Sequence, residues 1–274
     1  MHVLGVVGPS DSGKTTLVER LVEQLSDEHA VATVKHLHSP EIDTEGKDTA
    51  RHRAAGAGAT YGIGPEGWFA TGGEGGLDDT LDRLAPEYDY AIVEGYSDAA
   101  IPQVVLGGRD HRGETLLAAP DADAVEVAKV IAALDATEPY ETLQSLVHEI
   151  KQSPQTDRAG AIATFTGRVR TRDDPDDAPT EYLKFEKYEG VADERLADIK
   201  SDLEARDGVQ GVRLHHKTGV VPAGADIVFV VVLAGHRDAA FETVEDGIDR
   251  LKDEVPLFKK EVTTDESYWV HERA

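Results

Sequence analysis

The fold of the first half of the chain is decided by one glycine-rich stretch, Gly8-Pro9-Ser10-Asp11-Ser12-Gly13-Lys14-Thr15-Thr16. An apolar run over residues 3–7 comes just before it and is typical of a short buried strand. Leucine and valine then recur at helical spacing from Lys14 to Leu25, which predicts an amphipathic helix. The stretch fits the pattern G-x-x-x-x-G-K-[ST] between a strand and a helix, as this pattern requires. It is therefore predicted to be a phosphate-binding loop (P-loop); the alternative is a chance glycine turn.

Each part of this loop has a chemical role in holding a nucleotide. Glycines let backbone N–H groups face a phosphate at close range, and the helix that follows adds its positive N-terminal end. Lys14 supplies a charge to the β- and γ-phosphates, and the Thr15 hydroxyl suits a Mg²⁺ ion. The residues expected to bind the nucleotide are Gly8, Ser10, Asp11, Ser12, Gly13, Lys14, Thr15 and Thr16. Because the sequence has no Asn-Lys-x-Asp motif for guanine, the pattern alone leaves GTP and ATP open.

A magnesium-bound nucleotide also needs an acidic residue close to the loop. Glu94 directly follows the apolar run 90–93, where such a carboxylate is expected in a P-loop protein. Asp43, in the loop that follows Val34, is a second candidate. Each could instead be an ordinary surface acid. We therefore predict Thr15, Glu94 and Asp43 as the magnesium ligands.

The pattern of apolar runs divides the chain into two domains. In the first, short apolar runs alternate with amphipathic stretches, including helices predicted over residues 77–84 and 121–134. This alternation predicts a mainly parallel sheet covered by helices, an α/β domain of the P-loop NTPase-like type. Glu138-Pro139 breaks the pattern, and we place the boundary between residues 136 and 137.

The second domain, residues 137–274, is patterned differently. A helix is predicted over residues 140–151, and another over 239–252 must end before Pro256. The run 227–234 is nearly all β-branched, which is typical of a central strand. This order of helices and strands predicts an α+β domain.

The composition of the 274 residues narrows the class of protein. The chain contains no cysteine, so any sulfur chemistry must use sulfur from another molecule, and the cytoplasm is the simplest compartment. The net charge of −25 is spread over both halves, which is typical of a surface adapted to high salt and disfavours binding to nucleic acid or membrane. No apolar run approaches the roughly 18 residues needed to span a bilayer, and the first residues lack the pattern of a signal peptide.

Positively charged side chains recur after strands of the second domain, at the end of a helix and next to Pro256-Leu257-Phe258, although the domain is acidic overall. They are, in chain order, Arg168, Arg170, His236, Arg237, Lys252, Lys259 and Lys260. If they converge, they form an anion pocket for a small phosphorylated substrate, and a lysine among other cations becomes a better base or nucleophile. The alternative is that each cation merely pairs with a nearby acid.

Further motifs in residues 1–135 connect the P-loop domain with a known family. They are Val34-Lys35-His36-Leu37-His38, Asp43, Gly46-Lys47-Asp48, Ala54-Ala55-Gly56-Ala57 and Val93-Glu94-Gly95-Tyr96. With the loop, they resemble the MobB family, P-loop accessories to the guanylation of molybdopterin. The resemblance implies GTP as the ligand, weak or no independent hydrolysis, dimerisation, and the molybdopterin guanylyltransferase as a partner. The family usually has Asn where this chain has Asp11, which brings an extra negative charge near the phosphates.

Seven segments of the second half look like the large subunit of molybdopterin synthase, the MoaE family, and occur in the same order. They are residues 160–170, 183–188, 216–219, 234–241, 249–252, 256–261 and 269–270. The resemblance implies an α+β domain of the molybdopterin synthase large-subunit type. It also implies a sulfurtransferase that converts cyclic pyranopterin monophosphate into the dithiolene molybdopterin. The implied sulfur donor is the C-terminal thiocarboxylate of a small ubiquitin-like carrier, whose Gly-Gly tail enters the pocket.

The same resemblance assigns roles by position. Lys252 and Lys259 correspond to the catalytic lysines, and because Pro256 lies between them they must come from a helix end and the strand after it. The substrate-binding positions are Arg168, Arg170, His236, Arg237, Lys260 and Glu261, with Arg273 as a further arginine of some members. No covalently bound cofactor is expected in this domain, and the implied assembly is a homodimer within a heterotetramer.

Two other functions are compatible with the sequence. One is a non-catalytic nucleotide-binding scaffold of the same pathway, and the other is a P-loop NTPase with an unrelated regulatory domain.

Overall fold

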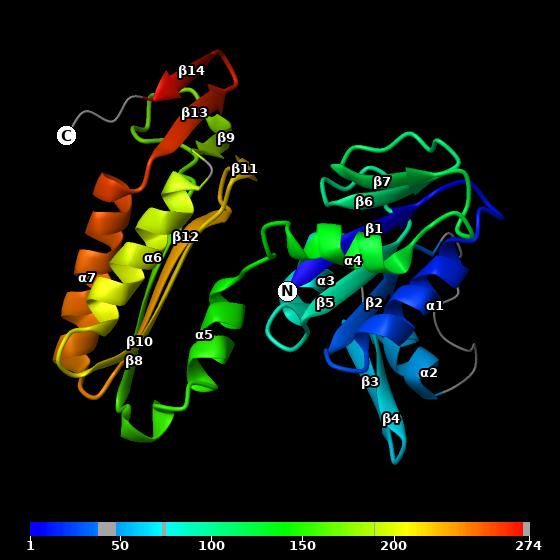
Figure 1. Cartoon of the computed structure of the whole chain (residues 1–274), viewed down its shortest axis with the longest axis horizontal. Helices are drawn as coiled ribbons and strands as arrows, with labels where there is room; N and C mark the ends of the chain where they lie inside the picture. Colours follow the sequence, from blue (N-terminus) through cyan, green and yellow to red (C-terminus); the bar gives the residue numbers. More distant parts are fainter. Residues whose placement is uncertain (38–47, 73–74, 189, 271–274) are drawn as a thin grey trace. The chain divides into compact units, whose positions relative to one another are not determined.

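The computed structural model describes residues 1–37, 48–72, 75–188 and 190–270, and the chain forms two compact units, Met1–Tyr140 and Glu141–Ala274 (Figure 1). The division lies a little beyond the boundary predicted between residues 136 and 137. Tyr140 belongs to the first unit because its N–H donates to the carbonyl of Met1 at 2.8 Å and its hydroxyl donates to Asp82 at 2.8 Å.

The first unit is built on a five-stranded parallel sheet in the order β2-β5-β1-β6-β7. Its strands are β1 (His2–Val7), β2 (Val31–Lys35), β5 (Tyr90–Glu94), β6 (Gln103–Leu106) and β7 (Thr115–Ala119). The predicted α/β class is therefore confirmed. Strand β7 was not predicted, because it is only partly buried and shows no clear alternation.

Helices cover both faces of this sheet. Helices α1 (Lys14–Leu25) and α4 (Val127–Asp135) share one apolar core with Leu4 and Ile92, and α3 (Leu77–Leu84) packs in a second core with Val3 and Val93. The start predicted for α4 at residue 121 is wrong, because the Asp121 carboxylate accepts the N–H groups of the next turn and holds residues 121–126 outside the helix. Helix α2 (Asp48–Ala54) and the hairpin of β3 (Ala59–Gly64) and β4 (Gly67–Gly72) complete the unit.

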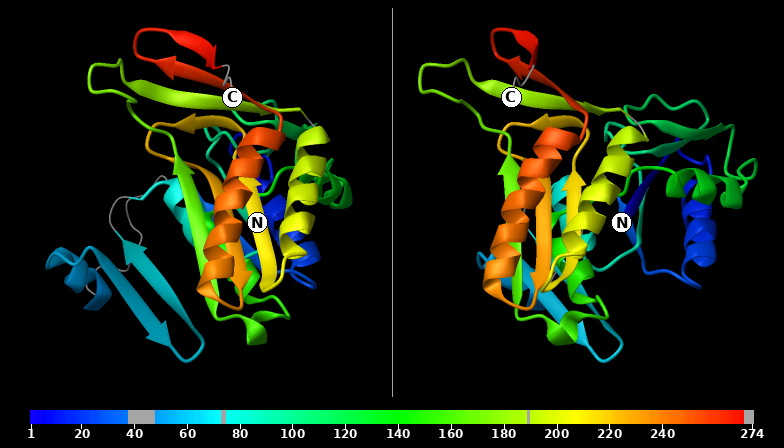
Figure 2. Two further views of the ribbon diagram at one scale, coloured as in Figure 1. Left: turned by 90° about the vertical axis from the view of Figure 1, so that its left-hand side faces the viewer. Right: turned by 60° about the vertical axis from the view of Figure 1, so that its left-hand side comes forward.

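The second unit contains an antiparallel sheet in the order β10-β12-β8. Strand β12 (Asp226–Ala234) lies between β10 (Val209–His216) and β8 (Ala161–Arg168), which confirms the predicted central strand. Its side chains alternate: Val230 packs in the core of α6 (Val191–Glu204) and α7 (Arg237–Glu254), whereas Val231 packs in the core of α5 (Leu143–Lys151). Figure 2 shows α6 and α7 side by side against the strands. Helix α5 begins three residues later than predicted, because Thr142 caps it.

A second antiparallel sheet follows the order β11-β9-β13-β14. It consists of β9 (Thr180–Lys187), β11 (Gly219–Pro222), β13 (Leu257–Thr263) and β14 (Ser267–Val270), and a 3₁₀ turn (Thr156–Arg158) precedes β8. The unit is thus an α+β domain, as predicted. Helix α7 ends before Pro256 and leads into β13, so Lys252 lies in a last helical turn and Lys259 in the strand that follows, as the sequence required.

Candidate functional site

The P-loop spans the turn between β1 and α1, and its backbone explains its residue types. Asp11 has φ 64° and Gly13 φ 83°, both in the left-handed region. A Cβ on Gly8 would lie 2.6 Å from the Ser12 hydroxyl oxygen, and one on Gly13 would lie 2.7 Å from the Cβ of Ala122. Glycine is therefore required at both ends of the loop. Asn and Asp are the non-glycine residues that best tolerate the left-handed region, so Asp11 fits this conformation.

The polar groups of the loop are already oriented by the protein. The Lys14 ammonium donates to the carbonyls of Gly8 at 3.0 Å and Pro9 at 2.6 Å, so it lies over the start of the loop. The Thr15 hydroxyl lies 3.1 Å from each carboxylate oxygen of Glu94, and Lys35 forms an ion pair with Glu94 at 3.0 Å. Ser10, Asp11, Thr15 and Thr16 are exposed at the surface where a phosphate would bind.

The predicted magnesium ligands are placed only in part. Thr15 and Glu94 are neighbours, and hydroxyl and carboxylate oxygens are ligands that Mg²⁺ accepts. Asp43 lies outside the described residues. Within the described ranges, no three His, Asp or Glu side chains cluster as a metal site would require. The Thr15–Glu94 pair therefore fits the magnesium of a bound nucleotide, which supplies its own phosphate oxygens.

A cavity of about 250 Å³ opens beside the loop. It is lined by Val7, Gly8, Pro9, Ser10, Lys14, His36, Gly95, Tyr96, Ser97, Asp98 and Arg109. These residues follow β1, β2, β5 and β6, whose carboxyl ends meet at one edge of the parallel sheet. Ligands of open parallel sheets bind at this edge.

In the second unit, the predicted cations lie at two different ends. Arg168 closes β8, where it donates to Gly224 and pairs with Asp226 at 3.2 Å, and Arg170 pairs with Asp173 at 3.0 Å. His236 and Arg237, by contrast, follow the opposite end of β12 and begin α7. Along α7, Arg237 and Lys252 are separated by about 22 Å. One copy of the chain therefore does not bring all the predicted cations into a common pocket.

Strand β13 divides its polar residues between two faces. In the register of the sheet, Lys259 lies opposite Phe185 and Glu261 opposite Leu183, beside the buried cluster of this sheet. Lys260 is on the other face, in the same row as Lys184 and Trp269. The expectation that Lys260 lines the same pocket as Lys259 is therefore not met within one copy. The Glu261 carboxylate accepts from Thr180, and Arg273 lies outside the described residues.

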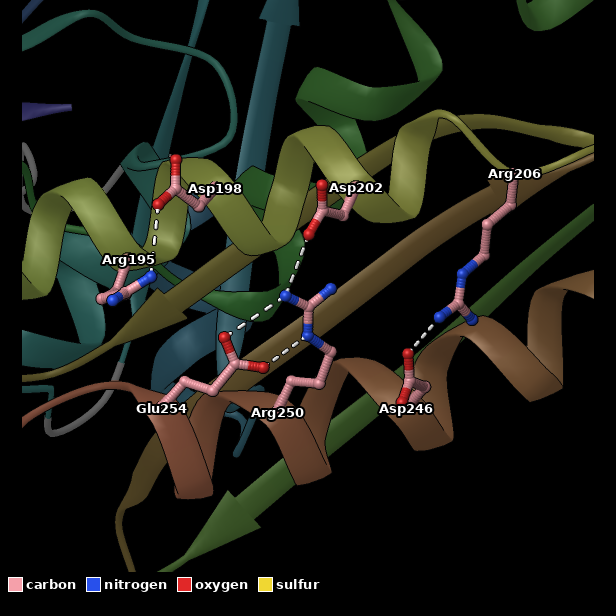
Figure 3. Close-up of polar contacts among 7 residues, drawn as sticks. All are labelled: Arg195, Asp198, Asp202, Arg206, Asp246, Arg250 and Glu254. Atoms are coloured by element: carbon pink, nitrogen blue, oxygen red, sulfur yellow. Dashed lines mark hydrogen bonds and ion pairs between the residues drawn. The ribbon is translucent and has the colours of Figure 1, made fainter.

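The end of α7 that carries Lys252 is held against α6 by ion pairs. Arg250 donates to Glu254 at 2.6 Å and to Asp202 of α6 at 3.0 Å (Figure 3). Because Lys252 lies between these two positions of α7, the same contacts fix the backbone that positions it.

Comparison with known proteins assigns both halves. The family described as molybdopterin guanine dinucleotide synthesis protein B (MobB) matches residues 3–132, and the MoaE protein family matches residues 136–254. A probable molybdopterin synthase of Haloferax volcanii is 54% identical over 274 residues, which cover 100% of both chains. The chain belongs to the molybdopterin synthase family, as a fusion of a MobB and a MoaE domain.

Other relatives match less than half of this chain. A molybdopterin synthase catalytic subunit of Yersinia pestis is 38% identical over 119 residues, 43% of this chain and 78% of the relative. A crystal structure of molybdopterin synthase from Staphylococcus aureus has 30% identity and a TM-score of 0.43, and the match covers 49% of this chain and 93% of that one. The protein is thus an enzyme of molybdenum cofactor biosynthesis. An unrelated regulatory domain in the second half does not agree with the MoaE match.

One residue of the MoaE domain was quoted in the sequence motifs without a role. His216 is buried, its Nδ1 lies 2.8 Å from the Lys217 carbonyl, and its ring meets that of Phe185 edge-on at 4.7 Å. Phe185 lies opposite Lys259 in the sheet, so His216 supports the surface on which this lysine sits. The motif that contains His216 indicates the family, but only the fold shows that His216 lies next to Phe185.

None of the helices described in either domain is both long and apolar enough to cross a membrane.

Proposed function

We propose that the MoaE domain transfers sulfur from the C-terminal thiocarboxylate of a small ubiquitin-like carrier to cyclic pyranopterin monophosphate, which gives molybdopterin. The observation that best supports this proposal is the position of Lys252 and Lys259 on either side of the junction between α7 and β13. The chain has no cysteine and each thiocarboxylate holds one sulfur, so the two sulfurs of the dithiolene come from two carrier molecules in turn, each of which leaves as the carboxylate. This agrees with the match to molybdopterin synthase catalytic subunits.

In this proposal the two lysines are the catalytic residues, and neighbouring cations hold the substrate. Arg168 ends β8 and Arg170 follows it, at the end of the sheet toward which α7 runs with Lys252, so their guanidinium groups suit the substrate phosphate. Their present partners, Asp226 and Asp173, are exposed acids that a phosphate can replace.

His236 and Arg237 require a second copy of the chain. They begin α7, far from Lys252, and Arg237 has as its ion-pair partner only the adjacent Asp238 in the described structure. A homodimer in which α7 of one copy starts beside the lysines of the other completes the pocket. With one carrier for each copy, the assembly is a heterotetramer.

The MobB domain is proposed to bind GTP with Mg²⁺ as an accessory of guanine dinucleotide cofactor formation, in contact with the molybdopterin guanylyltransferase. The glycine-dependent loop, the Lys14 ammonium and the Thr15–Glu94 pair support a nucleoside triphosphate. ATP is the alternative, because the described residues include no motif that reads the base. Thr15 and Glu94 would hold Mg²⁺, which would neutralise charge on the phosphates.

The sulfur-transfer proposal is tested with Lys252→Ala and Lys259→Ala in the full chain. With thiocarboxylated carrier and precursor, each variant should form dithiolene at least about a hundredfold more slowly. Lys151→Ala, an exposed lysine of α5, is the matched control and should react as the unchanged protein does. Unchanged dithiolene formation in both variants would end the assignment of these two lysines as the catalytic residues.

A further inference from the structure

Arg109 is a cation in the P-loop cavity that the sequence motifs do not mark. It lines the same cavity as Gly8 and Lys14. It follows β6 through Gly107 and Gly108, which have φ 60° and 66°. Within the described part of the chain, its guanidinium forms no hydrogen bond or ion pair, not even with Asp98 of the same cavity. An exposed arginine without an acid, in a chain of net charge −25, can bind an anion at little cost.

The topology of the sheet fixes the place of this arginine. Strand β1 lies between β5 and β6, so the P-loop, the segment after Glu94 and the segment after Leu106 surround one point at the sheet edge. Gly107 is in close contact with the loop, because a Cβ there would lie 3.1 Å from the ring of Pro9. The segment that carries Arg109 is thus packed against the first residues of the P-loop.

The same residues indicate which phosphate Arg109 faces. P-loop N–H groups cradle the α- and β-phosphates, whereas the loop lysine reaches the β- and γ-phosphates. Here the Lys14 ammonium lies over the carbonyls of Gly8 and Pro9, and the cavity is lined by this start of the loop rather than by Thr16. The other wall follows Glu94, which together with Thr15 would hold Mg²⁺ beside the phosphates that Lys14 reaches. The cavity therefore lies on the γ-phosphate side.

We propose that Arg109 binds the γ-phosphate and makes the MobB domain distinguish a nucleoside triphosphate from a diphosphate. This inference rests on the nucleotide site proposed above, and it names the residue that recognises the γ-phosphate of the bound nucleotide. Arginine suits the task because its planar guanidinium can donate two parallel hydrogen bonds to one phosphate. Since it reads the phosphate and not the base, the preference should hold for guanine and adenine nucleotides alike.

The test is calorimetric binding of GTPγS and GDP, each with Mg²⁺, to the full chain and its variants. Arg109→Ala should weaken GTPγS about ten- to a hundredfold and GDP less than about twofold, and Arg109→Lys should lie between. Arg112→Ala is the matched control: it removes the same charge from an exposed side chain three residues on, outside the cavity, and keeps the backbone bond from Arg112 to Ser97. It should bind both nucleotides as the unchanged protein does. ATPγS and ADP repeat the comparison for the other base.

The possible outcomes separate this inference from the site itself. If Arg109→Ala binds GTPγS as tightly as the unchanged protein, or loses both nucleotides equally, Arg109 does not read the γ-phosphate, although the P-loop site stands. If the unchanged chain binds no nucleotide, or Lys14→Ala binds as well as it does, the nucleotide site fails and the role of Arg109 fails with it. Thermal unfolding of each variant, expected to be unchanged, shows that a loss of binding does not come from loss of the fold.

Discussion

At the scale of single residues, a site residue could be predicted when it belongs to a continuous sequence motif. A residue that only the fold brings to the site could not. Gly8, Gly13 and Lys14 were predicted because the loop is a continuous motif whose backbone requires these residue types. Arg109 could not be predicted, since it reaches the same cavity only through the pairing of β6 with β1. Its local sequence, two glycines and an arginine after an apolar strand, is common to many surface loops.

A second residue-scale property, the charge state of His215, follows only from the fold. Burial, and after it the electrostatic effect of nearby His216, Lys217 and Lys187, lowers the pKa of His215 to about 3. The unfolded chain binds this proton near pH 6.5 and the folded chain does not, so stability is full above that pH and falls as the pH decreases toward 3. The loss is at most about 1.4 kcal/mol per pH unit in this window.

His215→Asn should therefore reduce the dependence of stability on acid pH. Urea unfolding between about pH 7 and pH 4 should show a shallower decrease in the free energy of unfolding for this variant than for the unchanged protein. His148→Asn, an exposed histidine of α5, provides the control and should retain the original slope. Equal slopes for His215→Asn and the unchanged protein would show that folding does not lower the pKa of His215.

At the scale of elements, amphipathic helices and buried strands were predictable, and paired short strands were not. Helices α1 and α3 have the predicted bounds because apolar residues recur along them at helical spacing. Strands β11 and β14 have four residues each, too few for a pattern, and they form because β9 and β13 offer them partners. Such pairing joins segments far apart in sequence, which no local pattern reports.

The position of Lys252 depends on the contact between helices α6 and α7. Arg250, with 22% of its side chain exposed, bridges Asp202 and Glu254, and it holds the pKa of Glu254 below its usual value (Figure 3). Arg250→Ala leaves two acids facing each other and should lower the melting temperature of the MoaE domain by about 3 °C. Differential scanning calorimetry measures this. Arg195→Ala breaks a pair within α6 that is 53% and 65% exposed, together with a weaker attraction to Glu254, and should lower the melting temperature by less than about 1 °C. Equal shifts would show that the bridge between the helices adds nothing.

At the scale of the whole molecule, the sequence identified both domains but not how the catalytic pocket is completed. The strand and helix order predicted an α/β and an α+β domain, and both are present. The order could not show that β12 and α7 place His236 and Arg237 at one end and Lys252 at the other, because that depends on strand direction. If the proposed homodimer forms, a motif read along one chain joins residues that belong to two different pockets.

Mixed dimers test this arrangement in full. In Lys259→Ala every pocket of the homodimer lacks the lysine, and in Arg237→Ala every pocket lacks the arginine, so both proteins should be weakly active. When equal amounts exchange subunits, half of the dimers are mixed, and each mixed dimer has one pocket with both defects and one with neither. Dithiolene formation should recover to about a quarter of the unchanged rate. If the two residues instead served one pocket of the same copy, every pocket would keep one defect, and mixing would restore nothing although mass spectrometry detects the mixed dimer.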